Sequence, residues 1–197
     1  MIDLDSAAQE KIAAYTGLVT AESERQNLVS RSTLEDFANR HVADSLQLLP
    51  LATPGLWVDV GSGAGLPGIL LAIAEPTRPV VMVEPRARRV EFLRFAISQL
   101  GLTNATVVAG KVEQLRDIRA AVISARAVAT LDKLFEWCGA IAEPSTVWLL
   151  PKGRTAASEL ESVKATWQGD FRLVRSVTDA EAAIVVARNV RRRSKAR

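Results

Sequence analysis

The stretch that decides the fold covers residues 57–68 and has the sequence WVDVGSGAGLPG. A short apolar run, residues 56–60, stops at a glycine-rich turn, and an apolar segment with helical spacing follows at residues 66–74. Glycines between a strand and a helix let the backbone turn tightly and approach a ligand closely. The stretch therefore predicts an α/β fold with a ligand at the carboxyl edge of its sheet.

Strands and helices alternate outward from this turn. Strands are predicted at 56–60, 79–83, 106–109, 120–124, 146–150, 171–177 and 182–187, and helices at 66–74, 86–100, 131–141 and 156–166. This alternation implies a parallel sheet covered on both faces, and the two consecutive strands at the end imply an antiparallel member. We expect a mostly parallel seven-stranded sheet with an antiparallel C-terminal strand.

The first 50 residues have a different pattern. Ala8, Ile12, Tyr15 and Val19 follow the 4-3-4 spacing of one buried helix face, and a second apolar series ends at Pro50. We expect an N-terminal helical cap over residues 1–50 and a Rossmann-like domain over 51–190. A basic, disordered tail is expected over 191–197.

Composition excludes several classes of protein. The chain has 197 residues, 48% of them hydrophobic, and no apolar run of about 18 residues that would predict a membrane span. Its first residues lack the pattern of a secretory signal. Cys138 is the only cysteine, which excludes an internal disulfide and a cysteine metal cluster. We expect a cytoplasmic protein without a metal site.

The net charge of +3 is unevenly distributed. Residues 191–197 carry five basic and no acidic side chains, whereas the remaining 190 residues carry 20 basic and 22 acidic ones. Residues 76–130 nevertheless have nine basic against four acidic side chains. Such localised positive charge suits a polyanion such as nucleic acid, although surface arginines can also serve only to keep a protein in solution.

Two carboxylates bear on the identity of the ligand. Glu84 follows Gly61 by 23 residues, at the end of the next predicted strand, where a carboxylate can accept both hydroxyls of a ribose. Gly63, Gly65 and Gly68 fit a GxGxxG pattern, so NAD or FAD must be considered. Asp59 would repel a pyrophosphate at this turn but attract the cationic end of S-adenosylmethionine, which favours the latter cofactor.

Four segments resemble a known family. They are RHVADS at 40–45, DVGSGAGLPG at 59–68, RAVA at 126–129 and KG at 152–153. Their order and spacing resemble the RsmG (GidB) family of bacterial small-subunit ribosomal RNA methyltransferases, and the likeness extends over nearly the whole chain.

The resemblance implies a Rossmann-like class I methyltransferase that methylates guanine N7 in 16S ribosomal RNA of the 30S particle. It implies S-adenosylmethionine as the cofactor. The cofactor contacts that we expect, from the residues and the resemblance together, are Asp59, Gly61, Gly63, Leu66, Glu84, Val112, Glu113 and Arg126. A methyltransferase acting on another substrate and an NAD-dependent oxidoreductase are the alternatives.

No catalytic base is expected. Guanine N7 has a free lone pair at neutral pH, so the enzyme needs only to align it with the methyl group, a positioning effect worth about 7–11 kcal/mol. The candidates for RNA binding are Arg40, His41 and Lys152. His41 could instead be a packed helical histidine, and Arg40 could simply pair with Asp44 one helical turn away. Lys152 is expected to be exposed, and Trp137 and Cys138 to lie in the core.

Overall fold

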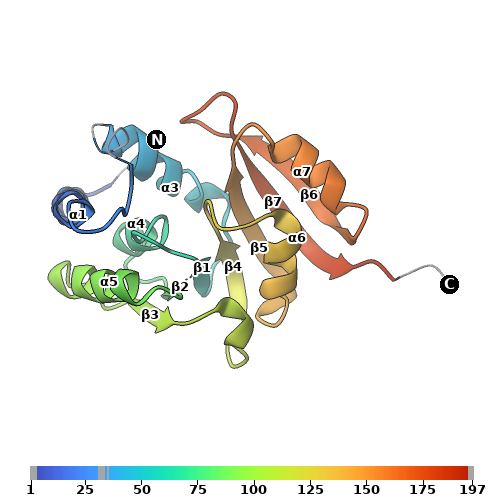
Figure 1. The fold of residues 1–197 in the computed structure, drawn as a ribbon, viewed down its shortest axis with the longest axis horizontal. Helices are drawn as coiled ribbons and strands as arrows, with labels where there is room; N and C mark the ends of the chain where they lie inside the picture. The colour runs from blue at the N-terminus through green and yellow to red at the C-terminus, as the bar shows by residue number, and fades with distance from the viewer. Residues whose placement is uncertain (1–3, 31–33, 35, 195–197) are drawn as a thin grey trace.

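The sheet has the order β3-β2-β1-β4-β5-β7-β6 in a computed structural model that describes residues 4–30, 34 and 36–194 (Figure 1). Strands β1 to β5 run parallel to one another, and β7 is inserted antiparallel between β5 and β6. The prediction of a mostly parallel seven-stranded sheet with an antiparallel C-terminal strand is confirmed.

The elements lie close to their predicted positions. The strands are β1 Trp57–Val60, β2 Val80–Glu84, β3 Ala105–Ala109, β4 Ala120–Ser124, β5 Ala142–Lys152, β6 Trp167–Arg175 and β7 Ala183–Arg192. The helices include α1 Ser6–Ser23, α3 Asp44–Leu46, α4 Gly68–Ala74, α5 Ala87–Gln99, α6 Leu131–Trp137 and α7 Ala156–Val163. A π-helix at Ala38–Ala43 leads into α3.

Helices cover both faces of the sheet, as parallel strands require. On one face, α1, α4 and α5 pack against the sheet through a cluster that includes Tyr15, Ile69 and Leu93. On the other face, α6 and α7 contribute Phe135 and Leu160 to a second cluster. Because β1 is buried along its whole length, every residue of this strand must pack against protein.

The N-terminal elements form part of the first of these clusters. Helix α1 packs on α4 and α5, and its fully buried Tyr15 donates a hydrogen bond from its hydroxyl to the Ala64 carbonyl at 2.7 Å. Ala64 lies in the glycine-rich turn. The cap therefore supports the turn directly, as well as covering the sheet.

The C-terminal end differs from the expectation. We predicted a disordered tail from residue 191, but Arg191 and Arg192 belong to β7 and pair with Gln168 and Trp167. The Arg192 guanidinium also lies 5.7 Å from the centre of the Trp167 ring, a distance at which a cation and an aromatic ring attract each other. Residues 195–197 of the predicted tail lie outside the described residues.

None of the helices in the described ranges is long and apolar enough to cross a membrane.

Candidate cofactor and substrate site

Asp59 lies beneath the glycine-rich turn and lines neither of the two cavities beside it. Its carboxylate is fully buried, with Oδ1 accepting a hydrogen bond from Ser124 Oγ at 2.7 Å and Oδ2 accepting one from the Gly68 backbone N–H at 3.2 Å. Burial raises the pKa of Asp59 to about 6. We predicted that Asp59 contacts the cofactor, but the structure has it tying the start of α4 to β4, because the end of β1 is covered on both faces.

Glu84 is positioned at the end of β2, as predicted. Its side chain is 2% exposed, and two backbone groups fix it: the Gly63 N–H donates to Oε2 and the Arg86 N–H donates to Oε1, both at 2.9 Å. Each carboxylate oxygen keeps a lone pair for a further hydrogen bond. The carboxylate is thus held rigidly between the glycine-rich turn and the start of α5.

A first cavity, of about 320 Å³, opens beside this carboxylate. Four of the predicted cofactor residues line it: Gly61, Glu84, Val112 and Glu113. The other lining residues are Val60, Val83, Pro85, Arg86, Arg89, Gly110, Lys111, Ala127, Val128 and Trp137. Its wall combines two carboxylates, those of Glu84 and Glu113, with several basic and apolar side chains.

Trp137 is a lining residue whose position differs from the prediction. It was predicted to lie in the core, but it is only partly buried and contributes to the cavity wall. Cys138 beside it is fully buried, as predicted, and burial raises the pKa of its thiol to about 12. Both lie in one apolar stretch, so the spacing of apolar residues could not predict that Cys138 is buried whereas Trp137 lines the cavity.

The loop after β4 closes the cavity over Gly61. A Cβ atom added at Gly61 would lie 2.6 Å from Cγ2 of Val128, and Gly61 has φ +66°, a conformation that side chains disfavour. Ala127 in the same loop has φ +56°. The absence of a side chain at Gly61 therefore lets the two loops approach each other.

A second cavity, of about 440 Å³, adjoins the first. The two share Gly61, Arg89 and Ala127, so they meet at Gly61 of the glycine-rich turn. The second cavity brings together His41, Gly63, Leu66 and Arg126 from the prediction. It is completed by Leu28, Val29, Ser30, Ser62 and Ala64.

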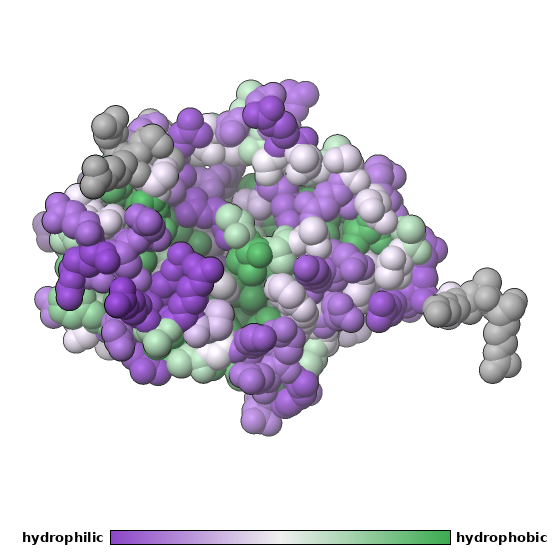
Figure 2. Space-filling model, viewed as in Figure 1, coloured by the Kyte–Doolittle hydropathy of each residue, from purple (hydrophilic) through white to green (hydrophobic). Residues whose placement is uncertain are grey.

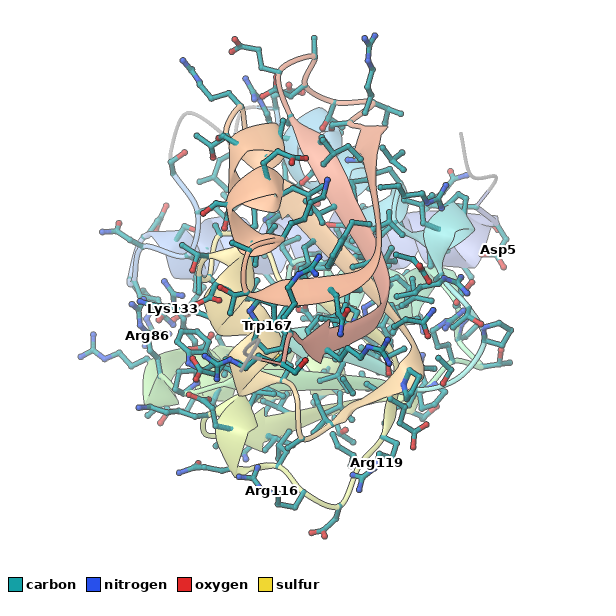
Figure 3. All side chains as sticks on the ribbon, turned by 90° about the vertical axis from the view of Figure 1, so that its right-hand side faces the viewer. Asp5, Arg86, Arg116, Arg119, Lys133 and Trp167 are labelled. Carbon is teal, nitrogen blue, oxygen red and sulfur yellow. The ribbon has the colours of Figure 1, made fainter. Side chains whose placement is uncertain are left out.

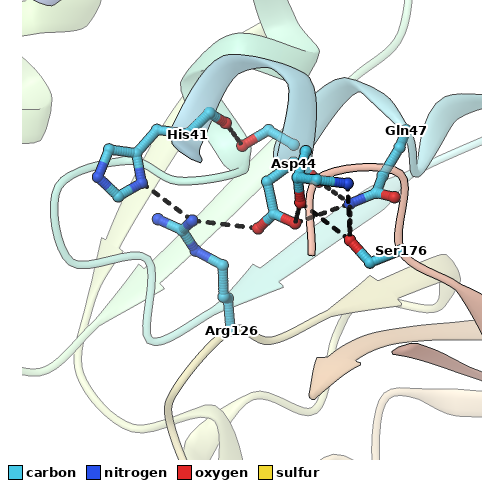
Figure 4. Close-up of polar contacts among 7 residues, drawn as sticks. His41, Asp44, Gln47, Arg126 and Ser176 are labelled. Carbon is cyan, nitrogen blue, oxygen red and sulfur yellow. Dashed lines mark hydrogen bonds and ion pairs between the residues drawn. The ribbon is translucent and has the colours of Figure 1, made fainter. Parts of the chain in front are cut away.

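Arg126 and His41 interact inside this second cavity (Figure 4). The Arg126 guanidinium lies 3.1 Å from His41 Nδ1 and 3.2 Å from Asp44 Oδ2. Burial and the neighbouring Arg126 charge lower the pKa of His41 to about 4, so the ring is neutral at pH 7. The His41 ring packs against the Phe37 ring, with 5.0 Å between their centres, and it also lines the second cavity. Both interpretations of this histidine from the sequence therefore hold for its position.

The other two RNA-binding candidates lie apart from these cavities. Lys152 was expected to be exposed, but its side chain is 13% exposed, and Nζ donates to the Ala129 carbonyl at 2.6 Å and to Glu159 at 3.1 Å. Glu159 comes from α7, a long-range partner that the sequence pattern did not reveal. Arg40 is exposed and lines neither cavity, and Asp44 pairs with Arg126.

The first cavity fits a nucleoside cofactor. Glu84 offers two fixed carboxylate oxygens for ribose hydroxyls, and Val112, Val128 and Trp137 offer apolar surface for a base. In the part of the chain that the structure describes, no group of three or more His, Cys, Asp and Glu side chains could hold a metal ion.

The sheet order and the glycine-rich turn define a Rossmann-like fold, which solved methyltransferases share. A methyltransferase from Geobacter sulfurreducens superimposes with a TM-score of 0.60 at 17% identity, covering 95% of this chain and 90% of that one. Precorrin-6y C5,15-methyltransferase from Geobacter metallireducens gives 0.58 at 14% identity, over 82% and 90% of the two chains.

The particular family follows from sequence. Residues 8–189 match the family of rRNA small subunit methyltransferase G, and the chain belongs to this family. Ribosomal RNA small subunit methyltransferase G of Rhizorhabdus wittichii is 47% identical over 193 residues, covering 96% of this chain and 88% of that protein. The protein of the same name from Erythrobacter litoralis is 46% identical, over 93% and 90% of the two chains. The RsmG resemblance is confirmed, and the oxidoreductase alternative is not favoured.

Proposed function

We propose that this chain transfers the methyl group of S-adenosylmethionine to N7 of a guanine in small-subunit ribosomal RNA. The observation that carries the proposal is the pair of adjoining cavities that share Gly61, Arg89 and Ala127. A methyl transfer needs two bound molecules in contact, and two compartments that meet at one turn provide that arrangement. The membership in a family of rRNA methyltransferases supports the RNA as the second molecule.

The first compartment would hold the nucleoside of the cofactor. Glu84 would accept hydrogen bonds from the ribose hydroxyls, and Val112 with Trp137 would cover the base. Gly61 lets the cofactor pass close to the backbone between the two compartments. The bound cofactor supplies an electrophilic methyl group. Asp59 would act indirectly, by fixing the turn from below through Gly68 and Ser124.

The second compartment would receive the guanine. Its walls include Arg126 and the neutral His41. Neither side chain needs to remove a proton from the guanine, because N7 is unprotonated and has a free lone pair. An enzyme that acts on a base takes it out of the stack and binds it in a pocket. The rate gain would therefore come from alignment, which can contribute about 7–11 kcal/mol.

The arginines at the start of α5 are the groups best placed to bind the RNA backbone. Arg86, Arg88 and Arg89 line a groove together with Gln26 and Asn27, and Arg89 also borders both compartments. Figure 3 shows Arg86 projecting on the side of the molecule away from Asp5. In Figure 2, apolar surface lies at the centre of the face seen in Figure 1, beside the polar surface over α5. A phosphate chain along this groove would bring a nucleotide to the second compartment.

Methyl transfer to isolated 30S particles tests the proposal. Wild-type protein with labelled S-adenosylmethionine should label 16S RNA, and mass spectrometry of the digested RNA should find the label as 7-methylguanine. Labelling of another base, of protein alone, or of nothing would contradict the proposal. The proposed substrate favours a cytoplasmic reaction. We propose a reaction without a protein-bound metal, so chelator treatment of the protein alone, before it is added to particles kept in Mg²⁺, should leave the rate unchanged.

A further inference from the structure

A single carboxylate joins three segments that are distant in sequence. Asp44, at the start of α3, accepts a hydrogen bond from Arg126 through Oδ2 at 3.2 Å. Its other oxygen, Oδ1, accepts from Gln47 Nε2 at 2.7 Å and from Thr178 Oγ1 at 3.1 Å. Arg126 follows β4, and Thr178 lies in the loop between β6 and β7. Figure 4 shows this carboxylate between the arginine and that loop.

The loop is held at a second point by Gln47, the residue that follows α3. The Val177 backbone N–H donates to Gln47 Oε1 at 2.9 Å, and Ser176 Oγ lies 3.3 Å from Gln47 Nε2 and 2.9 Å from Thr178 Oγ1. Gln47 therefore uses both ends of its amide. The segment 176–178 is fixed to α3 by its backbone and its hydroxyls, with the Val177 side chain 78% exposed at its surface.

The arginine that this carboxylate holds lines the second compartment. Asp44 and Arg126 have side chains that are 17% and 21% exposed, so their ion pair is largely withdrawn from water. A partly desolvated ion pair with further hydrogen bonds holds its geometry better than an exposed one, because water competes less for each group. The orientation of Arg126 is thus determined by a residue that lines neither cavity.

We propose that Asp44 is a positioning residue that orients Arg126 in the second compartment and ties this orientation to the β6–β7 loop. The inference rests on the proposed function, in which that compartment receives the target guanine. Asp44 itself touches neither the cofactor nor the base. Its Oδ1 partners, Gln47 after α3 and Thr178 on the loop, fix the carboxylate, and the fixed carboxylate turns the guanidinium toward His41.

His41 provides a direct readout of this arrangement. A guanidinium has no acceptor, so Nδ1 of His41 must be the acceptor in its contact with Arg126, and the neutral ring carries its proton on Nε2. Among the described residues, the charges that shift the pKa of the ring include those of Arg126, Asp44 and Arg40. His41 is the only histidine in the sequence. In protein without a histidine tag, the imidazole nitrogen signals in an NMR spectrum therefore belong to His41.

The test variant is Thr178→Val, which removes one donor to Asp44 and changes no charge. With the carboxylate less constrained, Arg126 should leave His41 part of the time. The ring should then show some Nδ1–H tautomer, and its pKa should rise from about 4 toward the ordinary value of 6.5. The kcat/KM for 30S particles should fall about fivefold to tenfold, a loss of about 1.0–1.4 kcal/mol in transition-state binding. The affinity for S-adenosylmethionine should stay within about twofold of wild type.

Glu181→Gln is the matched control on the same loop. Glu181 contacts Arg154 in an exposed ion pair, with side chains 68% and 80% exposed, and does not touch Asp44. This variant should match wild type in the His41 signals and in turnover. A second variant, Asp44→Asn, should lower kcat/KM for the particles more than Thr178→Val does, because it removes the ion pair.

Two outcomes would overturn the inference. One is a Thr178→Val protein whose His41 signals match those of wild type. The other is a loss of cofactor affinity as large as the loss of turnover. If wild-type protein fails to methylate 30S particles, the proposed function is wrong, yet the His41 signals still decide whether Asp44 positions Arg126.

Discussion

The Gly63 backbone N–H donates a hydrogen bond to Glu84 Oε2 at 2.9 Å, across 21 residues of sequence. This bond joins the two features that the sequence singled out, the glycine-rich turn and the acidic residue at the end of the next strand. It also explains why a carboxylate suits this position. One oxygen fixes the turn, the other accepts the Arg86 N–H, and both retain lone pairs for the cofactor.

Glu84→Gln should weaken the binding of S-adenosylmethionine by about 1–3 kcal/mol, the range for a hydrogen bond to a charged group. An amide has one oxygen, so one of the two backbone donors would face an N–H₂ group. Calorimetric titration measures the loss. Glu91→Gln, which makes the same change of charge on an exposed residue of α5, should bind normally. Normal binding by Glu84→Gln would mean that the ribose is held elsewhere.

Gly61→Ala should abolish cofactor binding, whereas Gly101→Ala should not. Both glycines have positive φ, +66° and +61°, so both substitutions strain the backbone by about 1–2 kcal/mol. Only at Gly61 would the new Cβ lie 2.6 Å from Val128, while Gly101 has open space around it. Thermal unfolding should show a loss of stability for both variants, at least as large for Gly61→Ala because of the Val128 contact, and a cofactor titration should separate them. Equal cofactor affinity in the two would contradict the role of the Val128 contact.

The order of elements and the place of the turn could be predicted because both depend on local patterns. Apolar periodicity located every strand of the sheet, and Glu84 was found from its distance to the turn. The direction of the Asp59 side chain could not be predicted, since β1 is buried on both sides and shows no alternation.

Long-range partners were equally hidden. Lys152 is covered because α7 brings Glu159 to it, and Trp137 faces a cavity because the loop after β4 ends beside α6. Such contacts depend on the packing of elements that no local pattern specifies. No local pattern predicted that β7 lies between β5 and β6 in the sheet.

Stability should respond to pH through Asp59 and His41 with opposite signs. The folded pKa of Asp59, about 6, lies above its unfolded value of 3.8, so this group lowers stability as the pH rises from 3.8 to 6. The folded pKa of His41, about 4, lies below its unfolded value of 6.5, so this group lowers stability as the pH falls from 6.5 to 4. Each effect is on the order of 3 kcal/mol.

Two variants separate these effects. Relative to wild type, Asp59→Asn should gain stability as the pH rises from 4 to 6, and His41→Gln should gain stability as the pH falls from 6.5 to 4. Urea unfolding at several pH values measures both differences. The other ionisable groups cancel in each comparison. A stability difference that stays constant with pH, in either variant, would show that the pKa of that group is not shifted.

The salt dependence of RNA binding should identify the RNA-facing arginines. Each neutralised phosphate contributes about 0.7–0.9 to the slope of log affinity against log salt. Arg88→Gln, an exposed residue of the groove at the start of α5, should therefore reduce the slope for 30S particles by nearly one unit. Arg172→Gln, on the edge strand at the other end of the sheet, should leave the slope unchanged.

Lys152→Ala provides the contrast with the arginines, because the Lys152 ammonium is bound within the protein. It donates to the Ala129 carbonyl and to Glu159, whose carboxylate also accepts the Leu131 N–H at 2.6 Å. Its removal leaves a partly buried carboxylate without its cation, so the variant should lose about 1–3 kcal/mol of stability in urea unfolding. Its salt slope should equal that of wild type. If Lys152→Ala lowered the salt slope and left stability unchanged, Lys152 would be an RNA-binding residue, and its ion pair with Glu159 would not stabilise the fold.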